Sequence, residues 1–273
     1  MGAAAEQAPV RQRRGWLAGI TGALTLGALG AALGGWLAWG TAPDLPDDRA
    51  AIALVQPLVP ASRLSVDRRH DPAFGYDPPE GAAALLFGGD DYNGGYVAFR
   101  VDPPSQNLTG ALGIARQALI DGNWTVSTRP ADLAGQLDGV VAVRGDLVVQ
   151  AYQEGASGLV LEIGRREPAP VGPMVALGAL AGLALGWLGM RRAVEGTPLT
   201  VVLAWAGAGF LAPCTLLTFP ITAMMYAAPA TGTVASWDIY TAFGFRFLAN
   251  LGILLLLAAT VTALIERRRH LPR

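Results

Sequence analysis

The chain contains no lysine, and this absence excludes several classes of enzyme. All 20 basic residues are arginines. Without lysine the chain cannot build a P-loop phosphate site, the ATP-binding site of a protein kinase, or a Schiff base with a carbonyl substrate. The use of arginine alone, together with 35 glycines, is typical of a genome with GC-rich codons. We therefore infer a high-GC bacterial source.

Cysteine and histidine are almost as scarce. Cys214 is the only cysteine, and His70 and His270 are the only histidines. One cysteine cannot form an intrachain disulfide, and three such residues far apart in the chain cannot supply the four ligands of a structural zinc site. The sequence therefore predicts no metal site and no cofactor.

Charged residues make up only 15% of the chain, whereas hydrophobic residues make up 52%. With a mean hydropathy of +0.38, this composition is typical of a membrane protein. The acidic residues are concentrated, because 17 of the 21 lie between residues 41 and 170, where they outnumber 10 arginines. A negatively charged segment is a poor match for a polyanion, so no nucleic-acid partner is expected.

Four long apolar runs predict four transmembrane helices, because a helix of about 20 apolar residues crosses the hydrocarbon core of a bilayer. Trp16 lies near the start of the first run and Trp36 and Trp39 near its end, as expected at membrane interfaces. A cleaved signal peptide is the alternative for this run, although the run is longer than the apolar part of such a peptide. Pro213 and Pro220 are expected to kink the third helix. The predicted helices cover residues 15–40, 169–190, 198–226 and 241–265.

The arginines at the ends of these runs predict the orientation of the chain. Three lie in the tail of residues 1–14, two in the 191–197 loop and four in the tail of residues 266–273. Positively charged segments favour the cytoplasmic side, so we expect both termini and this loop in the cytoplasm. Residues 41–168 and the 227–240 loop are then extracytoplasmic. The expected location is the plasma membrane, which the chain crosses several times.

A small α+β domain with the element order β-α-β-β-β is predicted over residues 82–168, between the first two transmembrane helices. Residues 41–81 are rich in proline and aspartate and show little periodicity apart from an apolar patch at 50–59. We interpret them as an extended linker with room for one edge strand. The apolar run at 96–101 predicts the first strand of the domain.

The helix of this domain is predicted to begin at Leu108 and to continue for about 14 residues, because apolar residues recur at helical spacing as far as Leu119. Asn107 is the expected N-cap, and Gly122 is expected to end the helix. Strands follow. Gly145 and Asp146 are expected to form the two-residue type II′ turn of a hairpin, and residues 159–163 alternate as a last strand.

Small residues recur at every fourth position along two predicted transmembrane helices, and such stripes let helix backbones approach closely. They can serve packing within the chain or contact with a helix of a partner, and the sequence leaves both open. The stripe residues are Gly19, Ala23, Gly27, Ala31 and Gly35 in the first helix, and Gly178, Gly182 and Gly186 in the second.

Few polar residues lie at membrane depth. Asn250 lies in the last predicted helix, Thr218 lies near Cys214 in the third, and Arg246 lies at the extracytoplasmic boundary, where Asp238 could pair with it. No acidic residue lies inside the four predicted helices. Proton-coupled and cation transporters usually carry an intramembrane carboxylate, so this pattern argues against such a transporter.

Two motif-like stretches have the wrong context for the chemistry that they resemble. Residues 207–212 match the glycine spacing of a dinucleotide-binding loop, but they lie inside an apolar run with no strand before them. Asp90 and Asp91 precede Asn93 and Gly94. We interpret this stretch as a solvated turn, in preference to a calcium-binding loop or an acid/base pair.

No common catalytic constellation is present, so the leading hypothesis is a non-enzymatic protein of the bacterial cell envelope. Its extracytoplasmic domain and helices would serve interaction or assembly with a membrane or envelope protein, while the lipid bilayer surrounds the helices. A small transporter or channel component is the first alternative. A membrane-bound enzyme with a carboxylate-only site at Asp90 and Asp91 is the second.

Overall fold

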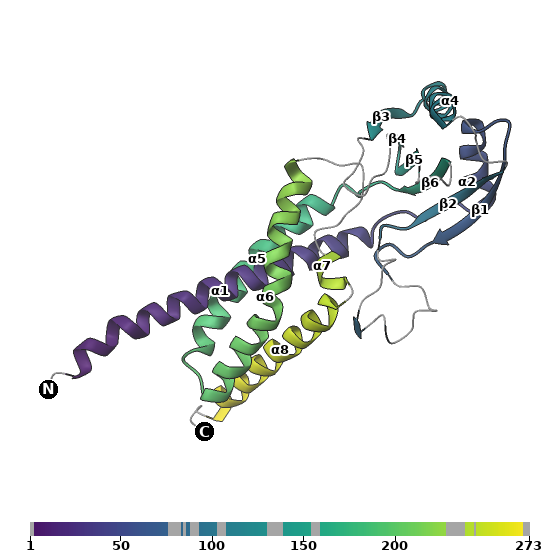
Figure 1. The fold of residues 1–273 in the computed structure, drawn as a ribbon. Helices are drawn as coiled ribbons and strands as arrows, with labels where there is room; N and C mark the ends of the chain where they lie inside the picture. Colours follow the sequence, from purple (N-terminus) through teal and green to yellow (C-terminus); the bar gives the residue numbers. More distant parts are fainter. Residues whose placement is uncertain are drawn as a thin grey trace.

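The computed structural model has two connected parts, a bundle of four long helices and a domain built on one β-sheet (Figure 1). We call residues 48–165 the sheet domain, and the helix ends beside it the domain end of the bundle. The opposite ends, which carry Arg191, Arg192 and Arg267, form the arginine end. The structure describes residues 3–75, 83, 86–87, 93–102, 108–129, 139–153, 159–227, 238–242 and 244–269, and it describes their side chains except at 3–14, 108–109, 128–129, 153, 222–227 and 238.

Four helices are long and apolar enough to cross a membrane, as the sequence predicts. The apolar part of the first begins at Gly15, although the helix itself extends back through the predicted N-terminal tail. The third remains one helix through Pro213 and Pro220. The four helices are α1 Ala3–Trp39, α5 Val171–Ala193, α6 Pro198–Ala227 and α8 Phe245–Arg269, and the short α7 Asp238–Thr241 precedes α8. This is the architecture of a multi-pass membrane protein.

The sheet domain contains six strands, and every neighbouring pair is antiparallel. The strands are β1 Arg63–His70, β2 Tyr96–Asp102, β3 Thr125–Arg129, β4 Gly139–Arg144, β5 Leu147–Gln153 and β6 Leu159–Arg165. Their spatial order is β1-β2-β6-β5-β4-β3, so the last strand in sequence lies inside the sheet. The chain therefore leaves the domain from an interior strand and enters α5 directly.

Three helical segments cover one face of the sheet and enclose its core. They are α2 Asp48–Val55, the 3-10 turn η1 Gln56–Leu58 and α4 Leu108–Asp121. Along β6, Leu159, Leu161 and Ile163 point into this core, while the residues between them are partly exposed. Alternate strand residues share a face, so this burial pattern follows from the alternation in the sequence.

The predicted span of the domain helix and the predicted hairpin are confirmed, whereas the expected N-cap Asn107 lies outside the described residues. Ala115 and Leu119 of α4 are fully buried against the sheet. The chain leaves this helix through Asn123, which has a left-handed φ of +59°. Gly145 and Asp146 join β4 to β5, and Gly145 has the φ of +60° that the first position of a type II′ turn requires.

The prediction of an extended linker over residues 41–81 is wrong for residues 48–58. Residues 48–58 form α2 and η1, and residues 63–70 form β1, which pairs with β2 at the edge of the sheet. The domain therefore begins well before residue 82. Its described elements follow the order α2-η1-β1-β2-α4-β3-β4-β5-β6, in place of the predicted β-α-β-β-β.

The short length of α2 explains this error. Its N-cap is Asp47, whose carboxylate accepts a hydrogen bond from the Ala50 backbone N–H at 2.8 Å. Ala51 and Val55 are fully buried on its inner side. A helix of 8 residues makes too few turns for its periodicity to be recognised. The single edge strand that the sequence allowed in this region corresponds to β1, whose residues are mostly polar.

Candidate functional site

The closest helix contact in the bundle joins α1 to α5. Three glycines of α5 face α1, and a Cβ atom at any of them would overlap a backbone carbonyl of α1. Such contacts require glycine, because any side chain would push the two backbones apart. The facing pairs are Gly178 with Gly30, Gly182 with Leu26, and Gly186 with Gly22.

On α1, the residues closest to α5 lie beside the predicted stripe. Gly22, Gly30 and Gly34 make the backbone contacts. Of the predicted stripe, Gly19 lies against Trp187, Gly27 lies against Leu183, Gly35 is buried, and Ala23 and Ala31 are half-buried. The predicted residues thus flank the line of contact. The glycines at 22, 30 and 34 have the same four-residue spacing, but the leucine at 26 interrupts them.

A second close contact joins α6 to α8. A Cβ atom at Gly207 would lie 3.0 Å from the carbonyl oxygen of Gly252 and 2.8 Å from Cγ of Leu256. One at Gly252 would lie 2.7 Å from Cγ of Leu211. In the sequence, Gly207 is notable only within a chance match to a dinucleotide-binding motif, whereas in the structure it lies in the contact between two helices. It was missed because each helix contributes one glycine to this contact, not a repeat.

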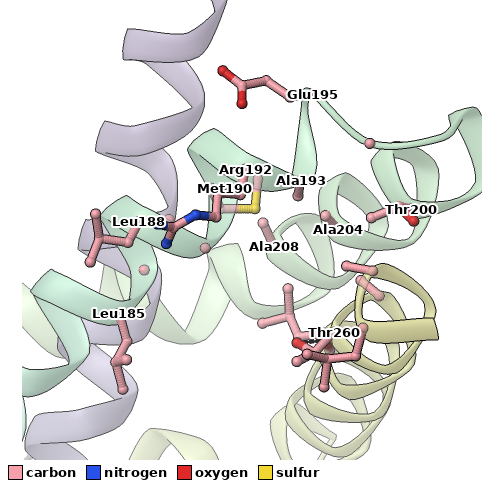
Figure 2. Close-up of a pocket in the computed structure, with 18 of the residues that line it drawn as sticks. Leu185, Leu188, Met190, Arg192, Ala193, Glu195, Thr200, Ala204, Ala208 and Thr260 are labelled. Carbon is pink, nitrogen blue, oxygen red and sulfur yellow. Dashed lines mark hydrogen bonds between the residues drawn. The ribbon is translucent and has the colours of Figure 1, made fainter. Parts of the chain in front are cut away.

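A cavity of about 1020 Å³ lies between these two helix pairs at the arginine end. The helix α1 contacts α6, but α5 has few contacts with α6 or α8, so the pairs are separated on that side. Figure 2 shows Leu185 and Leu188 on one side of the cavity and Ala204 and Thr260 on the other. The lining positions fall within residues 22–26, 185–197, 200–208 and 256–267.

The cavity occupies only one half of the bundle. Its lining on α8 covers residues 256–267, which is about 16 Å at 1.5 Å per residue. That depth is close to half of a hydrocarbon core of about 30 Å. At the domain end the helices pack around a buried cluster made of Ala28, Ala32, Ala38, Trp39, Phe74, Val171, Leu211, Cys214, Tyr240 and Ala249.

The cavity ends at a group of polar and charged side chains. The Glu266 carboxylate accepts hydrogen bonds from the hydroxyl groups of Thr197 and Thr200, which begin α6. Arg192 at the end of α5 and Arg267 at the end of α8 also line the cavity. Within the part of the chain that the structure describes, neither guanidinium forms an ion pair or a side-chain hydrogen bond. Both are exposed.

The three predicted intramembrane polar residues are not among the residues that line the cavity. The Thr218 hydroxyl donates to a carbonyl of its own helix, four residues earlier, at 2.8 Å. The Asn250 side-chain amide donates to the carbonyl of Leu86 at 3.5 Å. Arg246 is half-buried near the start of α8, and the side chain of its predicted partner Asp238 lies outside the described residues. The structure therefore does not bring these residues into one site.

A buried arginine holds the sheet domain at the domain end of the bundle. Arg165, at the end of β6, is only 4% exposed. Its Nε donates to the Pro43 carbonyl at 2.7 Å, and its Nη1 donates to the Gly94 carbonyl at 2.9 Å. Burial lowers the pKa of this guanidinium, and the carboxylates of Asp44 and Asp71 oppose that change. No pattern in the sequence indicates that this arginine is buried.

Aromatic contacts add to the attachment of the sheet domain. The Trp36 indole N–H donates to the Phe74 carbonyl at 3.2 Å, and the rings of Trp39 and Phe74 meet edge to face at 5.0 Å. The backbone N–H of Phe74 donates to the Asn93 carbonyl at 2.7 Å. The segment between β1 and β2 therefore packs directly on the end of α1.

The predicted carboxylate pair, Asp90 and Asp91, lies outside the described residues. Just after it, the Asn93 side chain accepts a hydrogen bond from the Gly95 N–H at 2.8 Å, and Gly95 has a φ of +82°. This is the local geometry of an asparagine turn. Among the described residues, no group of three histidine, cysteine, aspartate or glutamate side chains could hold a metal ion.

Comparison of the chain with protein families, with curated proteins and with solved structures finds no match. The candidate functional sites of this chain are therefore identified from its own structure and not from a relative. They are the cavity at the arginine end and the attachment of the sheet domain at the other end.

Proposed function

We propose that this chain is a non-enzymatic protein of the bacterial cell envelope that assembles with a membrane or envelope protein. In this proposal it resides in the plasma membrane, with both termini in the cytoplasm and the sheet domain outside, because arginine-rich segments favour the cytoplasmic side. The observation that carries the proposal is the attachment of the sheet domain to the bundle by the hydrogen bonds of Arg165 and the contacts of Phe74.

The attachment restrains the domain where the chain enters it and where the chain leaves it. Arg165 is the last residue of β6 and bonds to Pro43, which precedes the first helix of the domain. Phe74 packs on Trp39 at the end of α1. A domain held in this way presents its surface at a constant height and angle to the bilayer. Such pre-organisation favours binding, because little conformational freedom is lost when a partner docks.

The transporter alternative has less support. Its candidate residues Asn250, Arg246 and Thr218 lie apart from the cavity, and the Thr218 hydroxyl bonds to its own helix. The cavity itself occupies one half of the bundle, whereas a solute path must cross the whole of it. No observation on the outer domain favours the enzyme alternative.

The proposal can be tested by crosslinking the tagged full-length chain in its native membranes and comparing Arg165→Met with Arg100→Met. Arg100 is an exposed arginine on β2 and serves as a matched control. We expect one discrete complex from the wild type and from Arg100→Met, and loss of that complex from Arg165→Met at equal levels of membrane insertion. A wild-type chain that migrates only as a monomer and captures no protein would contradict the proposal.

A further inference from the structure

The cavity at the arginine end has the features of a lipid-binding site. Its side walls reach the surface of the bundle, because Leu185, Leu188 and Leu264 are 66%, 49% and 56% exposed. Its floor is formed by small residues, including Ala204 and Ala208, which are buried. An apolar molecule in the bilayer can therefore reach the cavity from the side.

The depth of the cavity favours a lipid over the helix of a partner. Its lining extends over about half the thickness of the hydrocarbon core, as given above. A transmembrane helix of a partner would need a groove along the full length of the bundle, but the domain half is packed around Leu211, Cys214 and Ala249. The acyl chains of a lipid occupy a single leaflet, and this matches the cavity.

The charge at the open end of the cavity selects an anionic headgroup. Arg192 and Arg267 come from different helix pairs and both line the cavity. Among the described side chains at this end, five arginines lie in residues 191–192 and 267–269, against Glu195 and Glu266, and both of these acidic residues also line the cavity. One of these, Glu266, accepts hydrogen bonds from Thr197 and Thr200. A phosphate bound at either guanidinium group would gain charge-assisted hydrogen bonds.

We propose that this cavity binds an anionic phospholipid, with its acyl chains between α5 and α8 and its phosphate at Arg192 and Arg267. Basic pockets between transmembrane helices bind such headgroups in the cytoplasmic leaflet. The bound lipid would fill the gap between the two helix pairs and hold them together. This inference goes beyond the proposed assembly role and does not depend on it.

Native mass spectrometry of the purified full-length protein can test the inference, with phosphatidylglycerol and phosphatidylcholine of identical acyl chains as probes. We expect one phosphatidylglycerol to be retained per chain, in preference to phosphatidylcholine. The Arg192→Gln/Arg267→Gln variant should bind it about 100-fold more weakly, because each guanidinium that contacts the phosphate contributes a charge-assisted hydrogen bond, equivalent to about a tenfold change.

A charge-matched control separates a specific site from general attraction. Arg268→Gln/Arg269→Gln removes the same charge from the same end, but these residues do not line the cavity. We expect this variant to retain phosphatidylglycerol as the wild type does. Equal weakening in the two double variants, or equal retention of the two lipids by the wild type, would overturn the proposal. Binding of soluble glycerol phosphate as tight as that of the lipid would also overturn it.

A second variant tests the acyl-chain part of the site without changing charge. Gly189 lines the cavity, and a Cβ atom there would meet no neighbour within 4 Å, so Gly189→Leu adds apolar bulk at the cavity wall where its Cβ has open space. Gly172 on the same helix is equally open but does not line the cavity, and Gly172→Leu is the control. We expect weaker retention of phosphatidylglycerol in Gly189→Leu alone, and unchanged retention in it would contradict the assignment.

Discussion

The Nε atom of Arg165 lies 2.7 Å from the carbonyl oxygen of Pro43, although 122 positions separate the two residues in the sequence. Pro43 lies between α1 and the sheet domain, and Arg165 is the last residue of the domain before α5. This bond therefore joins the two segments that connect the domain to the membrane. The same guanidinium also donates to Gly94, so one side chain closes the base of the domain.

Replacing Arg165 with methionine should destabilise the sheet domain by about 3 kcal/mol, because the buried Gly94 carbonyl and the part-buried Pro43 carbonyl lose a charged donor. Hydrogen exchange of the full-length protein, followed by mass spectrometry, should show faster exchange in β2 and β6. Arg100→Met is the matched control, since Arg100 pairs with Asp67 on the surface and such pairs contribute under about 1 kcal/mol. The same exchange rates in both variants would disprove the role of Arg165.

Replacing Gly182 with leucine should separate α1 from α5. The new side chain would overlap the Leu26 carbonyl, and overpacking of this kind costs about 1–3 kcal/mol. Unfolding of the purified protein in a detergent titration, followed by circular dichroism, measures the loss. Gly172→Leu on the same helix meets no neighbour and should change stability by less than about 0.5 kcal/mol. Equal stability of the two variants would mean that the helices do not meet at Gly182.

The hairpin between β4 and β5 should tolerate asparagine at position 145 better than alanine. Gly145 has a left-handed φ of +60°, which costs an L-residue such as alanine about 1–2 kcal/mol. Asparagine adopts this conformation more readily because its side chain can bond locally. Thermal unfolding should therefore rank glycine above asparagine and asparagine above alanine. An alanine variant as stable as the wild type would contradict the turn geometry.

The orientation of the chain can be measured with single cysteines in a Cys214→Ala background. Gln117 on α4 and Glu195 after α5 are both exposed and lie at opposite ends of the molecule. A thiol reagent that cannot cross the membrane should label Gln117→Cys in intact cells, and Glu195→Cys only after the cells are broken. The reverse pattern would contradict the expected placement of the arginines in the cytoplasm.

The sequence predicted α4 and the hairpin well because local chemistry determines both. Helical spacing of apolar residues marks the buried side of α4, and a glycine marks the tight turn at 145. The sequence did not allow the elements within residues 48–70 to be assigned, because α2 is short and β1 is a mostly polar edge strand. Val55 and the strand β1 are stabilised by contacts with parts of the sheet that are distant in sequence. A local sequence pattern cannot predict such contacts.

The sequence by itself determined the four long apolar helices, the scarcity of cysteine and histidine, and the presence of a small domain between the first two helices. These follow from composition and run length, which do not depend on what lies nearby in space. Only the tertiary structure decided that Gly22 and Gly30, and not Gly19, meet the backbone of α5. It also decided that β6 lies inside the sheet and that a cavity remains between the helix pairs. Several faces of a glycine-rich helix can pack equally well in isolation, so the choice among them depends on the shape of the neighbouring helix.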